Sequence, residues 1–480
     1  MQSAQRVSTG IGGLDEILNG GFIAGKAYMI RGGPGTGKTN FGSRFLCSGA
    51  AKGEKSLFIT LAETEKQIRA NGASLGFMYD GVDFLDLSPS SEFFSEVQAY
   101  DIFSSAEVER EPITQQITQH ISESRPVRVF VDSMTQMRYL APDPHQYRKQ
   151  VMSFVRFLSE QGATVLFTSE GSAEAPDSDL QFLSDGIIEL GFMASGRSLR
   201  VTKLRGSDFA AGTHALALDH HGVHVFPRLV PEGFKMEFSS QTISSGVKEL
   251  DEMMAGGLER GTITILTGPC GVGKTTLGLQ FMKEAASRGE RSVVYSFDEM
   301  QATMLHRAES MNIKLRDMMD RNLLSIVQVE PLRRTPHEVA HMIRREVEDK
   351  KARVLMLDSM SGYKLAFQGE ENLVQHIHAL TRYLRNMGVT AIFTNEVEAL
   401  TGDFRATEIG ISYLADNIVF MRYVEFQSEL RKVIGMLKKR ATDFQKSIRQ
   451  IEMTSNGFVV GEPLTNMEGL LTGIPRFRTS

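Results

Sequence analysis

Tryptophan is absent from this sequence, and cysteine occurs only twice, at Cys47 and Cys270. Two cysteines in so long a chain exclude a framework of disulfides, and we expect both thiols to be reduced. No apolar run is long enough to span a membrane, and the N-terminus lacks the charged-then-apolar pattern of a signal peptide. Without tryptophan, stacking on a bound aromatic ring must come from Phe, Tyr, Arg or aliphatic groups. These absences predict a soluble, cytoplasmic protein.

An excess of basic residues is also missing, since 58 acidic residues outnumber 53 basic ones and the net charge is −5. No segment rich in Lys and Arg, and no alternation of basic and aromatic residues, is evident. Nucleic-acid binding depends on neutralising phosphates with such residues. The composition therefore argues against a nucleic-acid partner, although an acidic protein can still present a basic pore.

The phosphate-binding pattern G-x-x-x-x-G-K-[ST] is present twice, at residues 32–39 and 268–275. Each copy follows an apolar strand-like run and precedes a helical pattern, which is the context that the motif needs. Backbone N–H groups of such a loop surround the phosphates, the lysine reaches the β- and γ-phosphates, and the final Thr hydroxyl binds Mg²⁺. We therefore expect ATP and Mg²⁺ at both loops, with the metal on Thr39 and Thr275. The expected nucleotide contacts are Gly33, Gly35, Thr36, Gly37, Lys38 and Thr39 in the first copy, and Pro269, Gly271, Val272, Gly273, Lys274, Thr275 and Thr276 in the second.

The similarity between the two halves extends beyond these loops. Lys38 and Lys274 are 236 positions apart, and so are Leu14 and Leu250. The segment 10–16 also recurs at 246–252, each time followed by a Gly-Gly pair. The chain is therefore a tandem duplication.

Strand and helix patterns alternate within each half, which predicts an α/β fold with a mainly parallel sheet covered by helices on both faces. A chain of 480 residues is too long for one core, so we expect two domains, at 1–227 and 241–480. Residues 228–240 interrupt the periodic pattern with Pro, Gly and a Ser-Ser pair, and are interpreted as a short linker.

One buried strand in each half ends in an acidic residue, Asp132 after 127–131 and Asp358 after 353–357. A carboxylate at this end of a parallel sheet, close to the phosphate loop, holds Mg²⁺ through water. We assign both to the nucleotide site in preference to a strand-end cap. The polar residues 168–170 and 394–396 end a further strand in each half, and are interpreted as sensors of the γ-phosphate or as ordinary strand-end turns.

The halves differ after the strand that follows the first long helix. Hydrolysis needs a carboxylate that polarises a water in line with the γ-phosphate. The second half offers two adjacent carboxylates, Asp298 and Glu299, whereas the first half offers only Glu63, after Ala62. These three acidic residues are the candidate bases, and the second half is the better-supported catalyst.

With these motifs the chain resembles the KaiC family of double-domain RecA-like ATPases, known from the cyanobacterial circadian clock and from bacterial relatives outside it. The resemblance rests on the segment 9–15, both phosphate loops, both Asp-Ser strand ends and two Lys-x-Arg segments, and it covers essentially the whole chain. It implies tandem RecA-like domains in stacked rings, commonly hexamers, with ATP between neighbouring subunits. Each half then lends basic residues to a neighbour's nucleotide, here Lys203, Arg205 and Ser207 in the first half and Lys438, Arg440 and Thr442 in the second.

The family pattern has two adjacent glutamates at the catalytic strand end, and the first of the pair is the usual base. Ala62 takes that position in the first half and Asp298 takes it in the second. The resemblance therefore implies slow or altered hydrolysis in the first half. Asp298 is one methylene shorter than Glu but chemically competent.

Clock members of the family phosphorylate themselves on adjacent Ser and Thr residues in the second half. Alignment on Asp416 places Ser412 and Tyr413 at these positions. Ser412 keeps a hydroxyl and is the candidate site of serine/threonine autokinase activity, whereas the Tyr413 oxygen lies a ring further out. The alternative is that this pair only packs at a subunit interface.

Clock members also carry a C-terminal tail that binds the activator KaiA. The sequence ends at 475–480, about where that segment would begin, so we expect no KaiA-type activator and allow for a KaiB-like or other signalling partner. The alternative function is a RecA/RadA-like DNA-dependent ATPase, a recombinase or helicase, against which the acidic composition argues. A scaffold with structural nucleotides is a third class.

Two further features have simpler interpretations than a functional site. His220, His221 and His224 surround a glycine between strand-like runs, which predicts a β-hairpin turn rather than a metal site. Cys270 stands at a variable position of the second phosphate loop, where a small residue is tolerated; a redox switch is the less favoured alternative.

Overall fold

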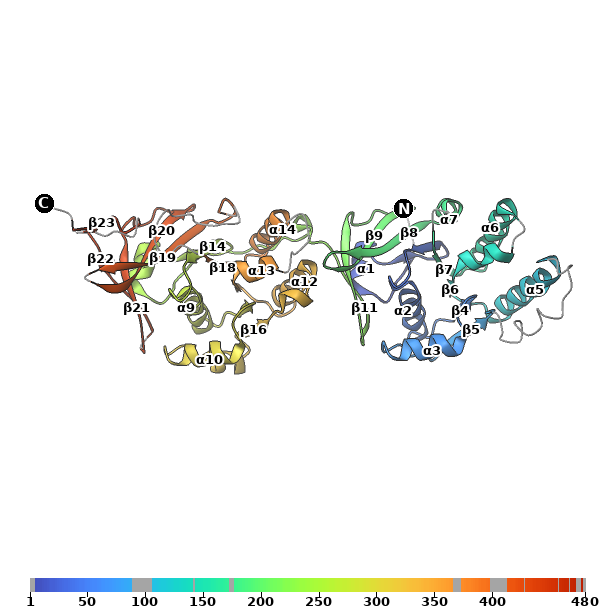
Figure 1. Ribbon diagram of the computed structural model, residues 1–480, viewed down its shortest axis with the longest axis horizontal. Coiled ribbons are helices and arrows are strands. Elements are labelled where there is room, and N and C mark those ends of the chain that lie inside the picture. Colours follow the sequence, from blue (N-terminus) through green and yellow to red (C-terminus); the bar gives the residue numbers. More distant parts are fainter. Residues whose placement is uncertain are drawn as a thin grey trace. The chain divides into compact units, whose positions relative to one another are not determined.

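The computed structural model (Figure 1) describes residues 5–88, 106–140, 143–171, 177–365, 373–397, 412–426, 428–455, 457–465, 467–471 and 476–477; for 106–114 and 139–140 only the backbone is described. It divides into two compact units, Met1–Arg228 and Leu229–Ser480. Each unit is described by itself.

The first unit is built on a nine-stranded sheet in the order β11-β10-β9-β8-β3-β7-β6-β4-β5. Its strands are β3 (Ala27–Arg31), β4 (Ser56–Thr60), β5 (Val82–Asp86), β6 (Arg128–Asp132), β7 (Thr164–Ser169), β8 (Gly186–Met193), β9 (Gly196–Leu204), β10 (Thr213–Asp219) and β11 (Gly222–Phe226). The pairings from β5 to β8 are parallel, and those from β8 to β11 are antiparallel. The helices are α1 (Gly12–Ile17), α2 (Lys38–Ala50), α3 (Glu65–Ala73), α5 (Ala106–Ser124), α6 (Pro144–Glu160) and α7 (Ser178–Leu183), and a small ribbon joins β1 (Arg6–Val7) to β2 (Phe22–Ile23).

The second unit repeats this plan with the order β16-β15-β17-β18-β14-β19-β20-β21-β22. Its strands are β14 (Ile263–Gly268), β15 (Ser292–Ser296), β16 (Leu324–Gln328), β17 (Val354–Asp358), β18 (Thr390–Glu396), β19 (Asn417–Phe426), β20 (Glu429–Lys439), β21 (Arg449–Thr454) and β22 (Gly457–Pro463). The helices are α8 (Lys248–Met253), α9 (Lys274–Ser287), α10 (Gln301–Glu309), α11 (Leu315–Asp320), α12 (Pro336–Glu348), α13 (Met360–Leu365) and α14 (Leu373–Asn386). Two short ribbons pair β12 (Thr242–Ile243) with β13 (Leu258–Glu259), and β23 (Met467–Glu468) with β24 (Arg476–Phe477).

The central strands are buried on both faces, which is why they appear in the sequence as continuous apolar runs. Along β6, alternate side chains enter different cores: Phe130 packs with Phe41 and Phe45 on one face, whereas Val129 and Val131 pack on the other. The second unit has the same two-sided core. The predicted fold class, two tandem α/β units with mainly parallel sheets, is therefore confirmed.

The segment interpreted as a linker packs onto the second unit. Leu229 is 5% exposed within a core of that unit, and the Phe234 ring meets Tyr383 edge to face at 5.1 Å between centroids. The backbone N–H of Met236 donates to the carbonyl of Asn386 at 2.9 Å. Much of the segment 229–238 is thus part of the second unit's packing rather than a free connection.

Candidate functional site

Each phosphate loop connects a central strand to the helix that follows it, as the sequence predicts. Gly37 and Gly273 directly precede α2 and α9 with φ of 102° and 118°, in the left-handed region that favours glycine. A Cβ on Gly273 would lie 1.9 Å from Met453 Cε, and one on Gly37 would lie 2.9 Å from Leu218. The positive φ would strain any other residue at these positions, and a side chain would also have to displace Met453 or Leu218.

Both loop lysines fold back onto their own loops. Lys38 Nζ donates to the carbonyls of Gly32 and Gly33 at 2.9 and 3.1 Å. Lys274 Nζ donates to Gly268 and Pro269, both at 2.8 Å. Burial lowers the pKa of the Lys274 ammonium, which is a cost that a bound phosphate would relieve.

A hydroxyl and a carboxylate meet beside each loop. Thr39 Oγ1 donates to Asp132 at 2.6 Å, and Thr275 Oγ1 donates to Asp358 at 2.8 Å. Burial raises the pKa of the Asp132 carboxyl and outweighs the opposing hydrogen bonds from Thr168 and Thr39 and the charge of Lys38, so the ionised form is costly to bury. Oxygen ligands of these two kinds suit Mg²⁺, and the residues present therefore fit that ion.

The residues interpreted as sensors divide into two roles. Thr168 and Thr394 donate to Asp132 and Asp358, both at 2.5 Å, and so support the carboxylates rather than facing a ligand. Glu170 forms an ion pair with Lys38 at 3.1 Å. In the second unit, Glu396 lines the pocket around the loop.

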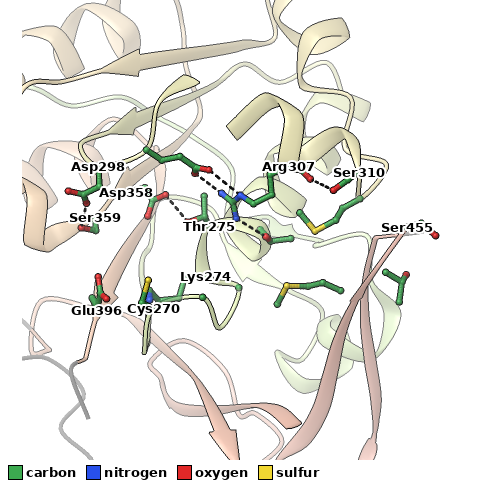
Figure 2. Close-up of a pocket in the computed structure, with 17 residues that line it drawn as sticks. Cys270, Lys274, Thr275, Asp298, Arg307, Ser310, Asp358, Ser359, Glu396 and Ser455 are labelled. Atoms are coloured by element: carbon green, nitrogen blue, oxygen red, sulfur yellow. Dashed lines mark hydrogen bonds and ion pairs between the residues drawn. The ribbon is translucent and has the colours of Figure 1, made fainter. Parts of the chain in front are cut away.

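That pocket, drawn in Figure 2, has a volume of about 560 Å³. It collects the second loop and both predicted carboxylates, Asp298 and Glu299. Asp298 accepts a hydrogen bond from Ser359 Oγ at 2.8 Å, and Figure 2 shows this pair beside Asp358. Glu299 instead forms an ion pair with Arg307, so two residues adjacent in sequence are held by different partners.

The first unit lacks the Asp298 carboxylate, because Ala62 occupies that position. Glu63 is exposed and accepts a hydrogen bond from Asn71 Nδ2 at 3.3 Å. Ser133, which corresponds to Ser359, is 6% exposed and follows Asp132 as expected. Glu63 corresponds in position to Glu299 and not to Asp298, because the strand residues Thr60 and Ser296 donate to the backbone carbonyls of Glu63 and Glu299 respectively.

A family model described as "ATPase: KaiC" matches residues 7–230 and again residues 243–465. The chain belongs to the KaiC ATPase family. The chain is 30% identical to a circadian clock oscillator protein KaiC of Synechococcus elongatus, over 99% of this chain and 92% of the relative. It is also 30% identical to the KaiC protein of Prochlorococcus marinus, over 98% of this chain and 95% of the relative. The resemblance read from the sequence is confirmed, and as a KaiC-family ATPase the protein binds nucleotide.

The Lys-x-Arg segments of this KaiC-family chain lie where β9 and β20 end. Their basic side chains donate to backbone carbonyls, and Arg440 also forms an ion pair with Asp416 at 3.5 Å. Lys203 donates to Gln181 at 2.7 Å and Arg205 donates to Phe182 at 3.2 Å. Lys438 donates to Ser412 at 3.0 Å, and Arg440 donates to Tyr413 at 2.8 Å. Ser207 accepts from Arg6 at 2.6 Å, and Thr442 donates to Glu259 at 3.2 Å. Among the described residues, none of the second set lines the pocket of its own loop.

Ser412 and Tyr413 are thus next to the basic segment of the second unit. The bond from Lys438 reaches the Ser412 carbonyl oxygen and does not involve the Ser412 hydroxyl. Tyr413 is 52% exposed. Residues 398–411, which precede them, lie outside the described part of the chain.

Sequence reasoning missed a basic residue that contacts each phosphate loop from a neighbouring hairpin. Arg197 donates to the carbonyl of Gly35 at 3.3 Å, and Lys432 donates to that of Gly271 at 3.1 Å. Each lies over an aromatic ring of the preceding strand. Arg197 and Lys432 are 235 positions apart, as are Lys203 and Lys438, and this repeat was the available signal.

The remaining predictions concern metals and membranes. His220 and His221 form the turn between β10 and β11, as the hairpin interpretation requires. Within the described residues, no group of three or more His, Cys, Asp or Glu side chains is arranged to hold a metal ion. Over the same part of the chain, no helix is long and apolar enough to cross a membrane.

Proposed function

We propose that this KaiC-family ATPase binds ATP and Mg²⁺ at both phosphate loops and hydrolyses ATP chiefly in its second half. The observation that carries the proposal is the position of Asp298, held by Ser359 beside the Thr275–Asp358 pair. A base must be close to the metal and the γ-phosphate, yet must not be neutralised by a basic partner. Of the two adjacent carboxylates, only Asp298 meets that condition.

In this proposal the residues of the second site divide the work. Lys274 exchanges its two loop carbonyls for phosphate oxygens, and Thr275 and Asp358 hold the metal. Bound Mg²⁺ supplies charge neutralisation on the phosphates. Asp298 orients a water and accepts its proton, while the Ser359 hydroxyl fixes the carboxylate.

The first half has the parts for binding but a weaker set for turnover. Its only carboxylate at the catalytic strand end is Glu63, which is turned toward Asn71. The Lys38–Glu170 ion pair must also open before the lysine reaches a phosphate. We propose that Glu63 supports slow hydrolysis there, so that the first half holds nucleotide for longer.

The deciding experiment measures phosphate release from the wild type, Lys38→Ala and Lys274→Ala. Lys274→Ala should remove most of the turnover and Lys38→Ala the smaller part. Equal losses, or a larger loss in Lys38→Ala, would contradict the proposed asymmetry. No release from the wild type would favour a scaffold with structural nucleotides.

We further propose that the protein assembles into rings, with hexamers or stacked hexamers as the expected form, and that nucleotide binding promotes assembly. The position of Lys203, Arg205, Lys438 and Arg440 at strand ends, facing carbonyls instead of their own loop, supports a role toward a neighbouring subunit. Mass photometry with and without ATP and Mg²⁺ tests this. A monomer under all conditions rules out shared sites.

We propose autophosphorylation on Ser412. Lys438 donates to the backbone carbonyl of this residue at 3.0 Å, so a phosphate on Ser412 would add about −1.5 to −2 charge in the neighbourhood of that ammonium. Intact-mass spectrometry and peptide mapping after incubation with ATP and Mg²⁺ should find one phosphate, absent from Ser412→Ala. Phosphate on Tyr413 contradicts the assignment, and no phosphate leaves an ATPase alone.

The alternative of a RecA/RadA-like DNA-dependent ATPase is not favoured by the family match or by the net charge. It keeps one clear test, which is ATP-stimulated, salt-dependent binding of single-stranded DNA. Such binding would reverse the ranking.

A further inference from the structure

The second site contains an arginine, Arg307, that has no basic counterpart in the first site. Arg307, on α10, holds the Glu299 carboxylate with two N–H donors, Nε at 3.2 Å and Nη2 at 2.6 Å. Its third donor, Nη1, reaches Thr276 Oγ1 at 3.2 Å, at the start of α9. One guanidinium therefore ties the catalytic strand end to the helix that begins at the phosphate loop.

The duplication supplies an internal comparison for this contact. Glu63 and Glu299 are 236 positions apart, and so are Asn71 and Arg307. Asn71 makes one hydrogen bond to Glu63, at 3.3 Å, where Arg307 makes a charged pair. The second half therefore has both Asp298 and Arg307, whereas the first half has Ala62 and Asn71 at these two positions.

The charge around each loop explains the pairing. The second pocket is lined by four carboxylates and two basic residues: Asp298, Glu299, Asp358, Glu396, Lys274 and Arg307. The matching positions of the first half hold three carboxylates and one basic residue: Glu63, Asp132, Glu170 and Lys38. Each set has two more carboxylates than basic residues, so Arg307 offsets the extra charge that Asp298 brings.

We propose that Arg307 is a positioning residue of the second site, which neutralises Glu299 and holds it aside so that Asp298 alone serves as base and MgATP still binds. The inference rests on the proposed function of that site. A bidentate arginine suits this role because its planar N–H groups match a carboxylate, whereas lysine offers charge without that geometry. Figure 2 shows Arg307 on the side of the pocket away from Asp298 and Ser359.

Removing the guanidinium would leave Glu299 uncompensated beside a ligand that is itself negatively charged. The expected effect falls first on nucleotide affinity, and it depends on the Glu299 charge. The test uses the full chain with Lys38→Ala, so that turnover comes from the second site. Arg307→Asn, the first-half residue, should raise the KM for MgATP about tenfold and change kcat about threefold or less.

The double variant Arg307→Asn/Glu299→Gln decides between positioning and simple packing. With the glutamate charge gone, KM should return to within about threefold of the Lys38→Ala parent. A KM that is raised equally in the single and double variants would mean that Arg307 only holds α10 in place, and would overturn the proposal. An unchanged KM in Arg307→Asn would overturn it too.

Two additions keep the test decisive. Arg307→Lys, which retains a charge, should raise the KM for MgATP about threefold. This variant replaces Arg307→Asn if thermal unfolding shows that Arg307→Asn is misfolded. A parental KM in folded Arg307→Lys would also overturn the proposal.

The matched control is Asn71→Ala in the Lys274→Ala background, which should change the KM of the first site less than about twofold. Calorimetric titration with the non-hydrolysable analogue MgAMP-PNP gives the same comparison as Kd. If the parent binds but does not turn over, the proposed hydrolysis fails while the Kd pattern still tests Arg307.

Discussion

The two halves of the chain share one strand order and the same phosphate-loop motif, yet they differ at the strand end where we propose that the catalytic base lies. The second half has Asp298, which accepts a hydrogen bond from Ser359, whereas the first half has Ala62 and Ser133 at the corresponding positions. Duplication kept the parts that bind a nucleotide in both copies. The carboxylate that we propose as the better base, Asp298, has no counterpart in the first copy, so on this proposal the two copies share nucleotide binding but differ in turnover.

The strongest way to break this comparison is to remove the better base. In the Lys38→Ala background, Asp298→Asn should lower second-site phosphate release about 10²- to 10⁴-fold, because Asn cannot accept the proton. Glu299→Asn is the matched control, and should cost much less, since Glu299 is already paired with Arg307. A small loss in Asp298→Asn with a large one in the control would transfer the role to Glu299.

Metal binding should be similar in the two halves, because the Thr–Asp pair is present in both. Thr39→Val and Thr275→Val, each in the background that disables the other loop, should raise the Mg²⁺ concentration for half-maximal turnover about 10- to 100-fold. Titration of Mg²⁺ at saturating ATP measures this. A large effect in one half alone would show that the halves bind the ion differently.

Introducing a carboxylate at position 62 tests whether its absence accounts for slow turnover in the first half. Ala62→Asp in the Lys274→Ala background should raise first-site turnover about tenfold or more, because Ser133 stands where Ser359 orients Asp298. Ala62→Asn controls for size and should give no gain. If Ala62→Asp is no faster, the difference between the halves lies elsewhere, with Glu170 and Lys38 as the next candidates.

The smallest expected effect concerns stability. Burial raises the pKa of Asp132, so its folded pKa lies above the unfolded value of about 3.9 and the wild type loses stability as the pH rises through that region. Asp132→Asn should therefore raise the Tm of the first unit's transition by about 2–4 °C at pH 7 without Mg²⁺, and by less near pH 4. Calorimetry at the two pH values checks this. The same variant should lose first-site turnover.

The fold could be predicted from the sequence because its signals are local. The strand before each loop, the glycines at Gly37 and Gly273, and the apolar run ending at Asp132 each depend on neighbours in the chain. The repeat then extended each assignment to both halves, with an offset of 236 positions at the phosphate loops and 226 between Asp132 and Asp358. The family followed from the same residues.

The contacts within the site could not be predicted from the sequence, because they join residues that are distant in sequence. Nothing near Asp298 indicates that Ser359, 61 positions later, would hold it. Arg307 reads as an ordinary basic residue of a helix until the fold places it on Glu299. The offset of 236 positions shows that Arg307 and Asn71 are equivalent positions in the two halves. Only the contacts with Glu299 and Glu63 show why an arginine in one half and an asparagine in the other would matter.

The segment that follows Arg228 also limits how the second half can be studied alone. The Phe238 ring lies so close to two glycines that a Cβ on Gly261 or Gly388 would be 2.7 or 2.6 Å from it, and Leu229 is buried in the same unit. A recombinant fragment beginning at residue 241 would leave this apolar surface open to water and prone to self-association. Expression of the second half should therefore begin at or before Leu229.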